Sequence, residues 1–240
     1  PYVALVQNAS FTSINAGSAV AVTVTNMLSG TAASNYVLTQ PIGLTANITP
    51  APVTISGLAV ANKVYDTTTT ATLSGAQTVS GLLGSDTATV SGSATGAFAT
   101  ADAGSAISVA VNVSGLTLSN GNYYVSGVAS PLTANITPAP ITISGLTAAN
   151  KVYDTTTAAT LTGAPEIAGG LLGSDTATLS GAASAGSFAS ANAANGIAVT
   201  PNLSSLTLSN SNYYVSGVTS PLTANITPAP VTIGGLTAAN

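Results

Sequence analysis

The clearest pattern in the chain is a strict alternation of apolar with small or polar residues. The apolar positions are Ile107, Val109, Val111 and Val113. A period of two predicts a strand with one buried and one solvated face. In the next copy of this segment Pro201 replaces Val111, and proline within a strand predicts an edge strand or a bulge.

Shorter runs predict further strands. Val53 and Ile55 begin one strand, and the threonine-rich stretch 64–73 is expected to be extended. Asn120-Gly121 lies between two apolar alternating runs and predicts a hairpin. A helical turn fits best at Leu82–Asp86, and apolar residues recur at helical spacing nowhere for more than one turn. The sequence therefore predicts an all-β protein.

Long segments of the chain recur. The nine residues that begin at Ala61 return at Ala149, and Leu44-Thr45-Ala46-Asn47-Ile48-Thr49-Pro50 returns twice. The period is about 88 residues, long enough for one small domain. We therefore expect a partial repeat over 1–49, complete repeats over 50–137 and 138–227, and the start of another over 228–240, in a segment of a longer array. The second complete repeat has one extra residue before Leu171 and one before Phe188, which predicts surface loops at both places.

The architecture expected of each repeat is a small antiparallel β domain. An immunoglobulin-like sandwich is the simplest form, and a β-grasp-like domain with a short helical element at 82–86 is the alternative. The junction Ile48-Thr49-Pro50-Ala51-Pro52 leaves no room for a flexible linker, and its prolines favour an extended connection. We expect the domains to follow one another in an elongated rod.

Composition excludes several functions. The chain has two lysines, six carboxylates and neither Arg, His nor Cys. Catalytic triads, thiol nucleophiles and phosphate clamps are thus absent, and we expect no enzyme activity and no catalytic residues. A net charge of −4 argues against nucleic-acid binding. No apolar run approaches the roughly 18–20 residues of a spanning helix, so we expect no membrane insertion.

The motif Lys-Val-Tyr-Asp-Thr-Thr at Lys63, followed about 60 residues later by Asn-Tyr-Tyr-Val and Ile-Thr-Pro-Ala-Pro, resembles a known family. It is similar to the YDG-type repeats of very large, filamentous-haemagglutinin-like bacterial surface adhesins, many of them exported by two-partner secretion. The resemblance spans essentially the whole chain. The family's glycine after Tyr-Asp is Thr67 and Thr155 here. The resemblance implies an extracellular stalk or adhesive filament.

The lysines Lys63 and Lys151 occupy the same place in both complete repeats. We expect each to form a partly buried ion pair, either with Asp66 and Asp154 or with Asp86 and Asp175. The alternative is a Lys–Asn isopeptide cross-link, which needs a neutral amine and a neighbouring carboxylic acid. Each such bond expels one ammonia, so intact mass tests for it.

Two other kinds of site follow from the residue types. We expect no cofactor and no metal site. Ca²⁺ is the one ion considered, through Asp66, Asp86 and Asp102, but Asn15 and Asn192 replace Asp102 in the other copies. In each of the pairs Tyr123-Tyr124 and Tyr213-Tyr214 one ring should face inward and one outward. An exposed tyrosine row is a candidate contact surface for sugars.

These observations favour the repetitive stalk of an extracellular or cell-surface bacterial adhesin that projects a binding tip and contributes to cell adhesion or a biofilm matrix. Its partners are expected to be other repeats and a host or matrix surface. One alternative is a filament subunit that self-assembles through edge strands, since the strands lack protective lysines. The other is that each repeat is a weak carbohydrate- or receptor-binding module.

Overall fold

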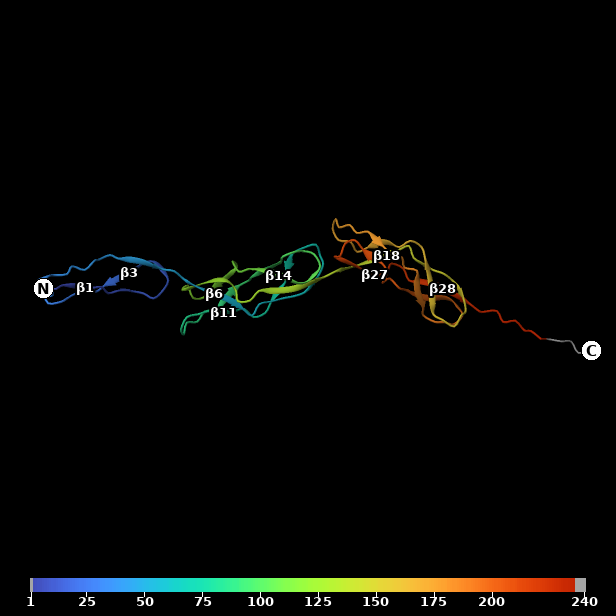
Figure 1. Cartoon of the computed structure of the whole chain (residues 1–240), viewed down its shortest axis with the longest axis horizontal. Helices are drawn as coiled ribbons and strands as arrows, with labels where there is room; N and C mark the ends of the chain where they lie inside the picture. The colour runs from blue at the N-terminus through green and yellow to red at the C-terminus, as the bar shows by residue number, and fades with distance from the viewer. Residues whose placement is uncertain (1, 236–240) are drawn as a thin grey trace, which may run out of the picture. The chain divides into compact units, whose positions relative to one another are not determined.

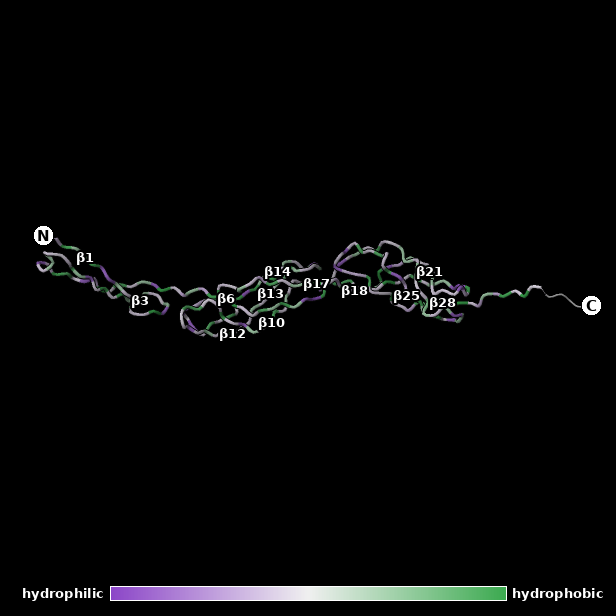
Figure 2. The backbone as a smooth tube through the Cα atoms, turned by 60° about the horizontal axis from the view of Figure 1, so that its bottom comes forward, coloured by the Kyte–Doolittle hydropathy of each residue, from purple (hydrophilic) through white to green (hydrophobic). Residues whose placement is uncertain are grey.

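A computed structural model describes residues 2–235 of the chain. The all-β prediction is confirmed, because the one helix in this part is the single-turn 3-10 helix η1 (Ala33–Asn35). Short hydrophobic stretches are distributed along the whole tube in Figure 2 and do not gather in one segment. This is the pattern expected when many short strands each bury one face.

The strands before the first complete repeat are β1 (Ala4–Val6), β2 (Ala9–Phe11), β3 (Gly17–Val24), β4 (Met27–Ser29) and β5 (Thr45–Ile48). The first complete repeat contains β6 (Ala51–Ser56), β7 (Ala59–Val60), β8 (Lys63–Val64), β9 (Thr70–Ala71), β10 (Leu73–Ser74), β11 (Thr78–Ser80), β12 (Val90–Gly92), β13 (Thr95–Phe98), β14 (Gly104–Asn112), β15 (Leu116–Leu118), β16 (Tyr123–Val128) and β17 (Leu132–Thr137).

The second complete repeat contains β18 (Ala139–Ser144), β19 (Thr147–Ala148), β20 (Lys151–Val152), β21 (Ala158–Thr162), β22 (Glu166–Gly169), β23 (Leu179–Ser180), β24 (Ala185–Phe188), β25 (Ala194–Pro201), β26 (Thr207–Leu208), β27 (Tyr213–Val218) and β28 (Leu222–Thr227). The segment 228–235 forms no strand, and Val231 and Ile233 are exposed. The remainder of the predicted further repeat, 236–240, lies outside the described residues.

The chain forms two compact units, and these cut across the sequence repeats. The first unit comprises the described residues up to Ala61, together with 70–97 and 108–133. The second comprises 62–69, 98–107 and the described residues from Ala134 onward. Three segments of the first repeat, 62–69, 98–107 and 134–137, therefore belong to the same unit as the whole second repeat.

The core of the first unit is built on β6, labelled in Figure 1. This strand pairs antiparallel with β11 and parallel with β16, and its Val53 and Ile55 side chains are fully buried. Burying such a side chain contributes about 1.5–3 kcal/mol. Smaller sheets join β2 to β3 and β5, β1 to β4, β7 to β10, and β12 to β15. On β14 the predicted alternation is confirmed, with Val109 buried between exposed Ser108 and Ala110.

The second unit repeats this arrangement. Strand β18 pairs antiparallel with β22 and parallel with β27, and its buried residues are Ala139, Ile141 and Ile143. A sheet of order β19-β21-β24-β25-β28-β20 covers a cluster that includes Leu161, Phe188 and Ile226. In the same unit β8 pairs parallel with β17. Most pairs are antiparallel as predicted, but these parallel pairs were not foreseen.

The predicted Asn120-Gly121 hairpin is wrong. Strand β15 pairs with β12, whereas β16 pairs with β6. The side-chain carbonyl of Asn120 accepts the N–H of Asn122 at 3.0 Å, and the Tyr123 N–H donates to the Asn120 carbonyl at 3.2 Å. This Asx turn redirects the chain to another sheet and does not return it alongside β15.

Three other local expectations are corrected. Residues 82–86 form a turn and no helix, because Gly84 has φ +56°, outside the helical region. The stretch 64–73 is interrupted at Thr67, whose φ is +68°. Pro201 ends β25, which is an internal strand between β24 and β28 and no edge. Its bulge lies instead between Ala194 and Ile197.

The two added residues of the second repeat are accommodated differently. The one before Leu171 falls in β22, where Gly169 pairs with Thr142 and Ile167 with Ile143. Ala168 is thus the extra residue of a β-bulge, and the predicted loop is wrong here. The one before Phe188 falls in the loop between β23 and β24, as predicted.

Candidate functional site

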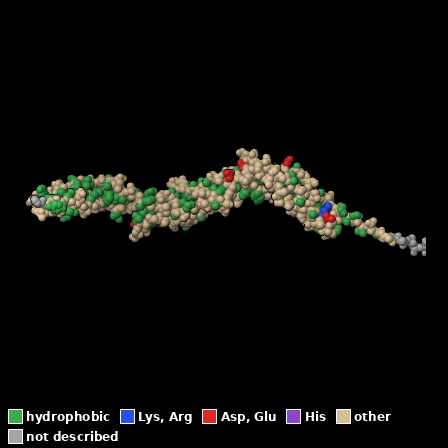
Figure 3. Space-filling model, in the orientation of Figure 1, with side chains coloured by type: hydrophobic (Ala, Val, Ile, Leu, Met, Phe, Trp, Pro, Cys, Tyr) green, Lys and Arg blue, Asp and Glu red, His purple; other side chains and the backbone are tan. Residues whose placement is uncertain are grey.

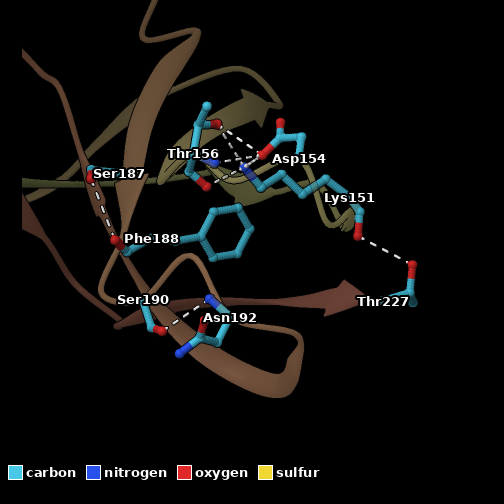
Figure 4. A network of polar contacts seen from close by, with 8 residues as sticks. All are labelled: Lys151, Asp154, Thr156, Ser187, Phe188, Ser190, Asn192 and Thr227. Carbon is cyan, nitrogen blue, oxygen red and sulfur yellow. Dashed lines mark hydrogen bonds and ion pairs between the residues drawn. The ribbon is translucent and has the colours of Figure 1, made fainter. Parts of the chain in front are cut away.

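The two lysines begin strands β8 and β20, and each side chain contacts the loop that follows its strand. Lys63 Nζ donates to Asp66 Oδ1 at 2.6 Å, to the Thr68 carbonyl at 2.6 Å and to Thr68 Oγ1 at 3.1 Å. Lys151 Nζ donates to Asp154 Oδ1 at 2.7 Å, to the Thr156 carbonyl at 2.7 Å and to Thr156 Oγ1 at 3.1 Å. Figure 4 draws these residues and their contacts. Each ammonium also lies 5.5 Å from the centre of a phenylalanine ring, Phe98 or Phe188.

The charges of these loops stabilise each other. The hydrogen bond from Lys151 and those from Thr156 lower the pKa of Asp154 to about 2. The hydrogen bond from Lys63 likewise lowers the pKa of Asp66. The residue between the aspartate and the threonine that bind each lysine is Thr67 in one loop and Thr155 in the other. Their φ angles are +68° and +69°. A left-handed backbone is costly for a β-branched residue, so the loops hold it through these hydrogen bonds.

The structure assigns each lysine one carboxylate partner of the two considered. Lys63 pairs with Asp66 and Lys151 with Asp154, each at i,i+3. Asp86 and Asp175 accept hydrogen bonds from tyrosines instead. The donors of both ammonium groups go to aspartate and threonine oxygens. The isopeptide cross-link remains a prediction for intact mass.

Asp175 lies in a cluster of two tyrosines. Its Oδ2 accepts the hydroxyl of Tyr213 at 2.6 Å and the hydroxyl of Tyr65 at 2.7 Å. The backbone N–H of Leu172 donates to the Tyr213 oxygen at 3.0 Å. The equivalent Asp86 accepts only Tyr123, at 2.7 Å, among the described contacts. Asp175 therefore connects a loop of the first repeat to the second repeat within one compact unit.

Packing and electrostatics favour neutral tyrosines at this carboxylate. The rings of Tyr65 and Tyr213 meet edge to face at 5.4 Å, and both are buried. The hydrogen bond to Asp175 and desolvation raise the pKa of Tyr65 to about 12. Burial and the same carboxylate raise the pKa of Tyr213. The hydrogen bonds from Tyr213 and Tyr65 lower the pKa of Asp175.

An asparagine makes a second contact between repeats. The Ala103 N–H donates to Asn212 Oδ1 at 2.7 Å, and Asn212 Nδ2 donates to Asp102 Oδ1 at 2.9 Å. The hydrogen bond from Asn212 lowers the pKa of Asp102. Asn212 is buried, so these bonds satisfy an amide that would be costly to leave unpaired.

The same asparagine contact occurs in the first unit. The Ala16 N–H donates to Asn122 Oδ1 at 2.8 Å, and Asn122 Nδ2 donates to Asn15 Oδ1 at 3.0 Å. We call the set Asn15, Ala16, Asp86, Asn122 and Tyr123 the first junction. We call the set Tyr65, Asp102, Ala103, Asp175, Asn212 and Tyr213 the second junction.

The first junction contains a cleft of about 740 Å³. Its lining includes Ile14, Asn15, Leu83, Asp86 and Tyr123. At the equivalent aspartate of the second junction, the Tyr65 hydroxyl is bound.

Neither junction is evident from the sequence, in which Asp86 and Asp175 are candidate lysine partners and Asp102 is a candidate calcium ligand. A signal was present: each aspartate precedes an Asn-Tyr pair by nearly the same distance, 37 residues from Asp86 to Tyr123 and 38 from Asp175 to Tyr213. That spacing does not reveal the contacts across 106–110 residues that form the junctions.

The other predicted residues are placed separately. Asp66, Asp86 and Asp102 are bound to Lys63, Tyr123 and Asn212, respectively. Within residues 2–235, no three or more His, Cys, Asp or Glu side chains gather as a metal site would require. Figure 3 shows acidic and basic side chains only at isolated spots on the face in view.

The paired tyrosines divide as predicted. Tyr123 and Tyr213 are buried, whereas Tyr124 and Tyr214 are 52% and 50% exposed. Only the outer member of each pair is therefore available as a contact aromatic. No helix within the described residues has the length and apolar character needed to cross a membrane.

Comparison with known proteins gives one result. The model of the YDG domain family matches residues 49–131 and again residues 137–221. The chain matches no curated protein and no solved structure. The two matches cover more than half of the chain and coincide with the segments that carry the lysine loops and the junction aspartates. The chain therefore belongs to the YDG domain family and contains two YDG domains in tandem.

Proposed function

We propose that this chain is a non-catalytic structural region of an extracellular bacterial surface adhesin of the filamentous-haemagglutinin-like kind. Its tandem repeats would form a stalk that projects a binding region, with many weak contacts adding avidity at a host surface or in a biofilm matrix. The observation that carries this proposal is the recurrence of the junctions. Asn122 and Asn212 make equivalent bonds to the preceding repeat, and serial specific contacts are what a spacer requires.

The electrostatics support the same function. Only 3% of residues are charged, and the two lysines are each paired within their own loops. Surface ion pairs contribute little and are screened by salt. Stability should therefore change little with ionic strength, which suits a protein exposed to an external medium.

Accessibility on intact cells tests the location. Antibodies against this chain should label intact bacteria, and protease added outside should remove the label while a cytoplasmic marker persists. Deletion of residues 50–227 from the protein that contains this chain should reduce adhesion and leave export to the cell surface in place. Labelling seen only after lysis would contradict the proposal.

A carbohydrate-binding role is the second candidate, because Tyr124 and Tyr214 are equally exposed at equivalent positions of β16 and β27. Exposed aromatic rings stack on sugars. The test is saturable binding of the chain to a glycan panel, with the double variant Tyr124→Ser and Tyr214→Ser as the matched control. A spacer shows no saturable signal, whereas a binding module loses its signal in the double variant.

A further inference from the structure

The second repeat presents a second copy of the surface that the first repeat contributes to the second junction. Tyr153 corresponds to Tyr65 by the repeated motif, and Asn192-Ala193 correspond to Asp102-Ala103. Tyr65 is 7% exposed and Tyr153 is 39% exposed. Ala103 is partly buried, whereas Ala193 is exposed. The same surface is thus covered at one repeat and open at the next.

The open surface has the backbone geometry of the covered one. The Tyr153 N–H donates to the Thr227 carbonyl at 2.8 Å, as that of Tyr65 does to Thr137. The Asn192 N–H donates to Ser190 Oγ at 3.1 Å (Figure 4), as that of Asp102 does to Thr100. The loop that follows Tyr153 is held by the hydrogen bond from Lys151 to Asp154. Little ordering remains to be done on binding, which favours association.

We propose that the surface formed by Tyr153, Asn192 and Ala193 is a docking site for a further YDG repeat that follows in the same chain. The aspartate of that repeat equivalent to Asp175 accepts the Tyr153 hydroxyl. Its asparagine equivalent to Asn212 accepts the Ala193 N–H and donates to Asn192. Asparagine serves in place of Asp102 because Asn15 accepts the same bond from Asn122.

The complementary half of this contact is present at the first junction. Asp86 binds one tyrosine where Asp175 binds two. The cleft beside Asp86 is lined by Leu83 and Tyr123, which correspond to Leu172 and Tyr213 beside Asp175. Within residues 2–235, Tyr65 and Asp175 make the tyrosine contact, and Tyr153 and Asp86 occupy the equivalent positions of its two sides. The inference goes beyond the proposed function, since it holds wherever the protein is located.

Extension of the chain by one repeat tests the proposal. Asn240 occupies the position of Asn150, so residues 151–227 appended after Asn240 continue the array in register. Amide hydrogen exchange is measured at Ala193 in the chain and in the extended chain, with Ala103 as the internal reference. We expect exchange at Ala193 to slow by about tenfold or more, toward that of Ala103, because its N–H gains an acceptor.

Two variants of the extended chain test whether the proposed contacts cause the slower exchange at Ala193. Alanine in place of the appended copy of Asn212 should restore fast exchange at Ala193 while the core amides of the appended repeat stay protected. Tyr153→Phe should lower the melting temperature of the extended chain and leave that of the original chain unchanged. An appended repeat with protected core amides and no slowing at Ala193 overturns the proposal. If residues 151–227 fail to fold after Asn240, residues 63–137 can be appended in their place, and exchange at Ala193 is measured in the same way.

Discussion

The nine-residue motif at Ala61 and at Ala149 is identical in sequence, yet its tyrosine has two environments. In both copies the lysine donates to the aspartate and to the threonine carbonyl, and the corresponding hydrogen-bond distances differ by 0.1 Å. Tyr65 is buried against Asp175 and Tyr213, whereas Tyr153 is partly exposed. The loop conformation is therefore a local property of the sequence, and burial of the tyrosine depends on the repeat that follows.

Among the substitutions that test this comparison, removal of Asp175, the acceptor shared by Tyr65 and Tyr213, should lower the melting temperature most. Asp175→Ala leaves two tyrosine hydroxyls without their carboxylate, and Tyr213 is buried. Unpaired buried donors are costly, so we expect the melting temperature to fall by about 8 °C. Asp86→Ala is the matched control, because it removes the acceptor of one tyrosine only, and should cost roughly half as much. Equal losses in circular-dichroism melts would show that Tyr65 adds nothing at Asp175.

Single hydroxyl deletions compare the two motif copies directly. Tyr65→Phe keeps the ring against Tyr213 and removes the bond to Asp175, so we expect a fall of about 4 °C. Tyr153→Phe should change the melting temperature by less than about 1 °C, since an exposed hydroxyl remains solvated without a partner. Similar effects of the two substitutions in thermal melts would contradict a role of the second repeat.

Glycine at the left-handed position should stabilise both loops. Thr67 and Thr155 have φ of +68° and +69°, which costs a β-branched residue about 1–2 kcal/mol. Part of this is offset by the flexibility of glycine in the unfolded chain. Thr67→Gly and Thr155→Gly should each raise the free energy of unfolding by about 0.5–1 kcal/mol in urea titrations. Thr69→Gly, outside that conformation, is the control and should be destabilising.

The smallest of the expected effects is the loss of stability that follows when acid protonates the aspartates of the lysine loops. The pKa of Asp154 is lowered to about 2 by Lys151, so its contribution is present above the unfolded value near 4 and is lost as the pH falls from about 4 to 2. The Asp154 side chain is 51% exposed, so the loss should be about 1–2 °C in melting temperature. The double variant Asp66→Asn and Asp154→Asn should show a flatter decline between pH 4 and 2. An unchanged slope would mean that other carboxylates cause the acid response.

The strands and their buried faces could be predicted because alternation is local. Val109 on β14 and the inward Tyr123 and Tyr213 lie where a period of two places them. The pairing of strands was harder to infer. Asn120-Gly121 has the composition of a hairpin turn, but β16 pairs in parallel with β6, about 70 residues away. Nothing in a short window distinguishes a turn that returns a strand from one that redirects it.

The candidate site divides in the same way. The Lys63–Asp66 pair spans three residues and was among the expected alternatives. The Tyr65–Asp175 bond spans 110 residues and crosses from one repeat to the next. Each repeat carries both groups, so the sequence offers two equivalent tyrosines and two equivalent aspartates. Which tyrosine meets which aspartate is decided by how the domains pack.

The direction of the tyrosine contact has a final consequence. One domain gives the phenol and the following domain gives the carboxylate, so the contact is heterologous and never satisfies itself by two-fold symmetry. A heterologous contact of this kind sets no limit on the number of domains that can follow one another. Duplication or deletion of one repeat in the gene can therefore lengthen or shorten the array by one domain without any change to the contact residues.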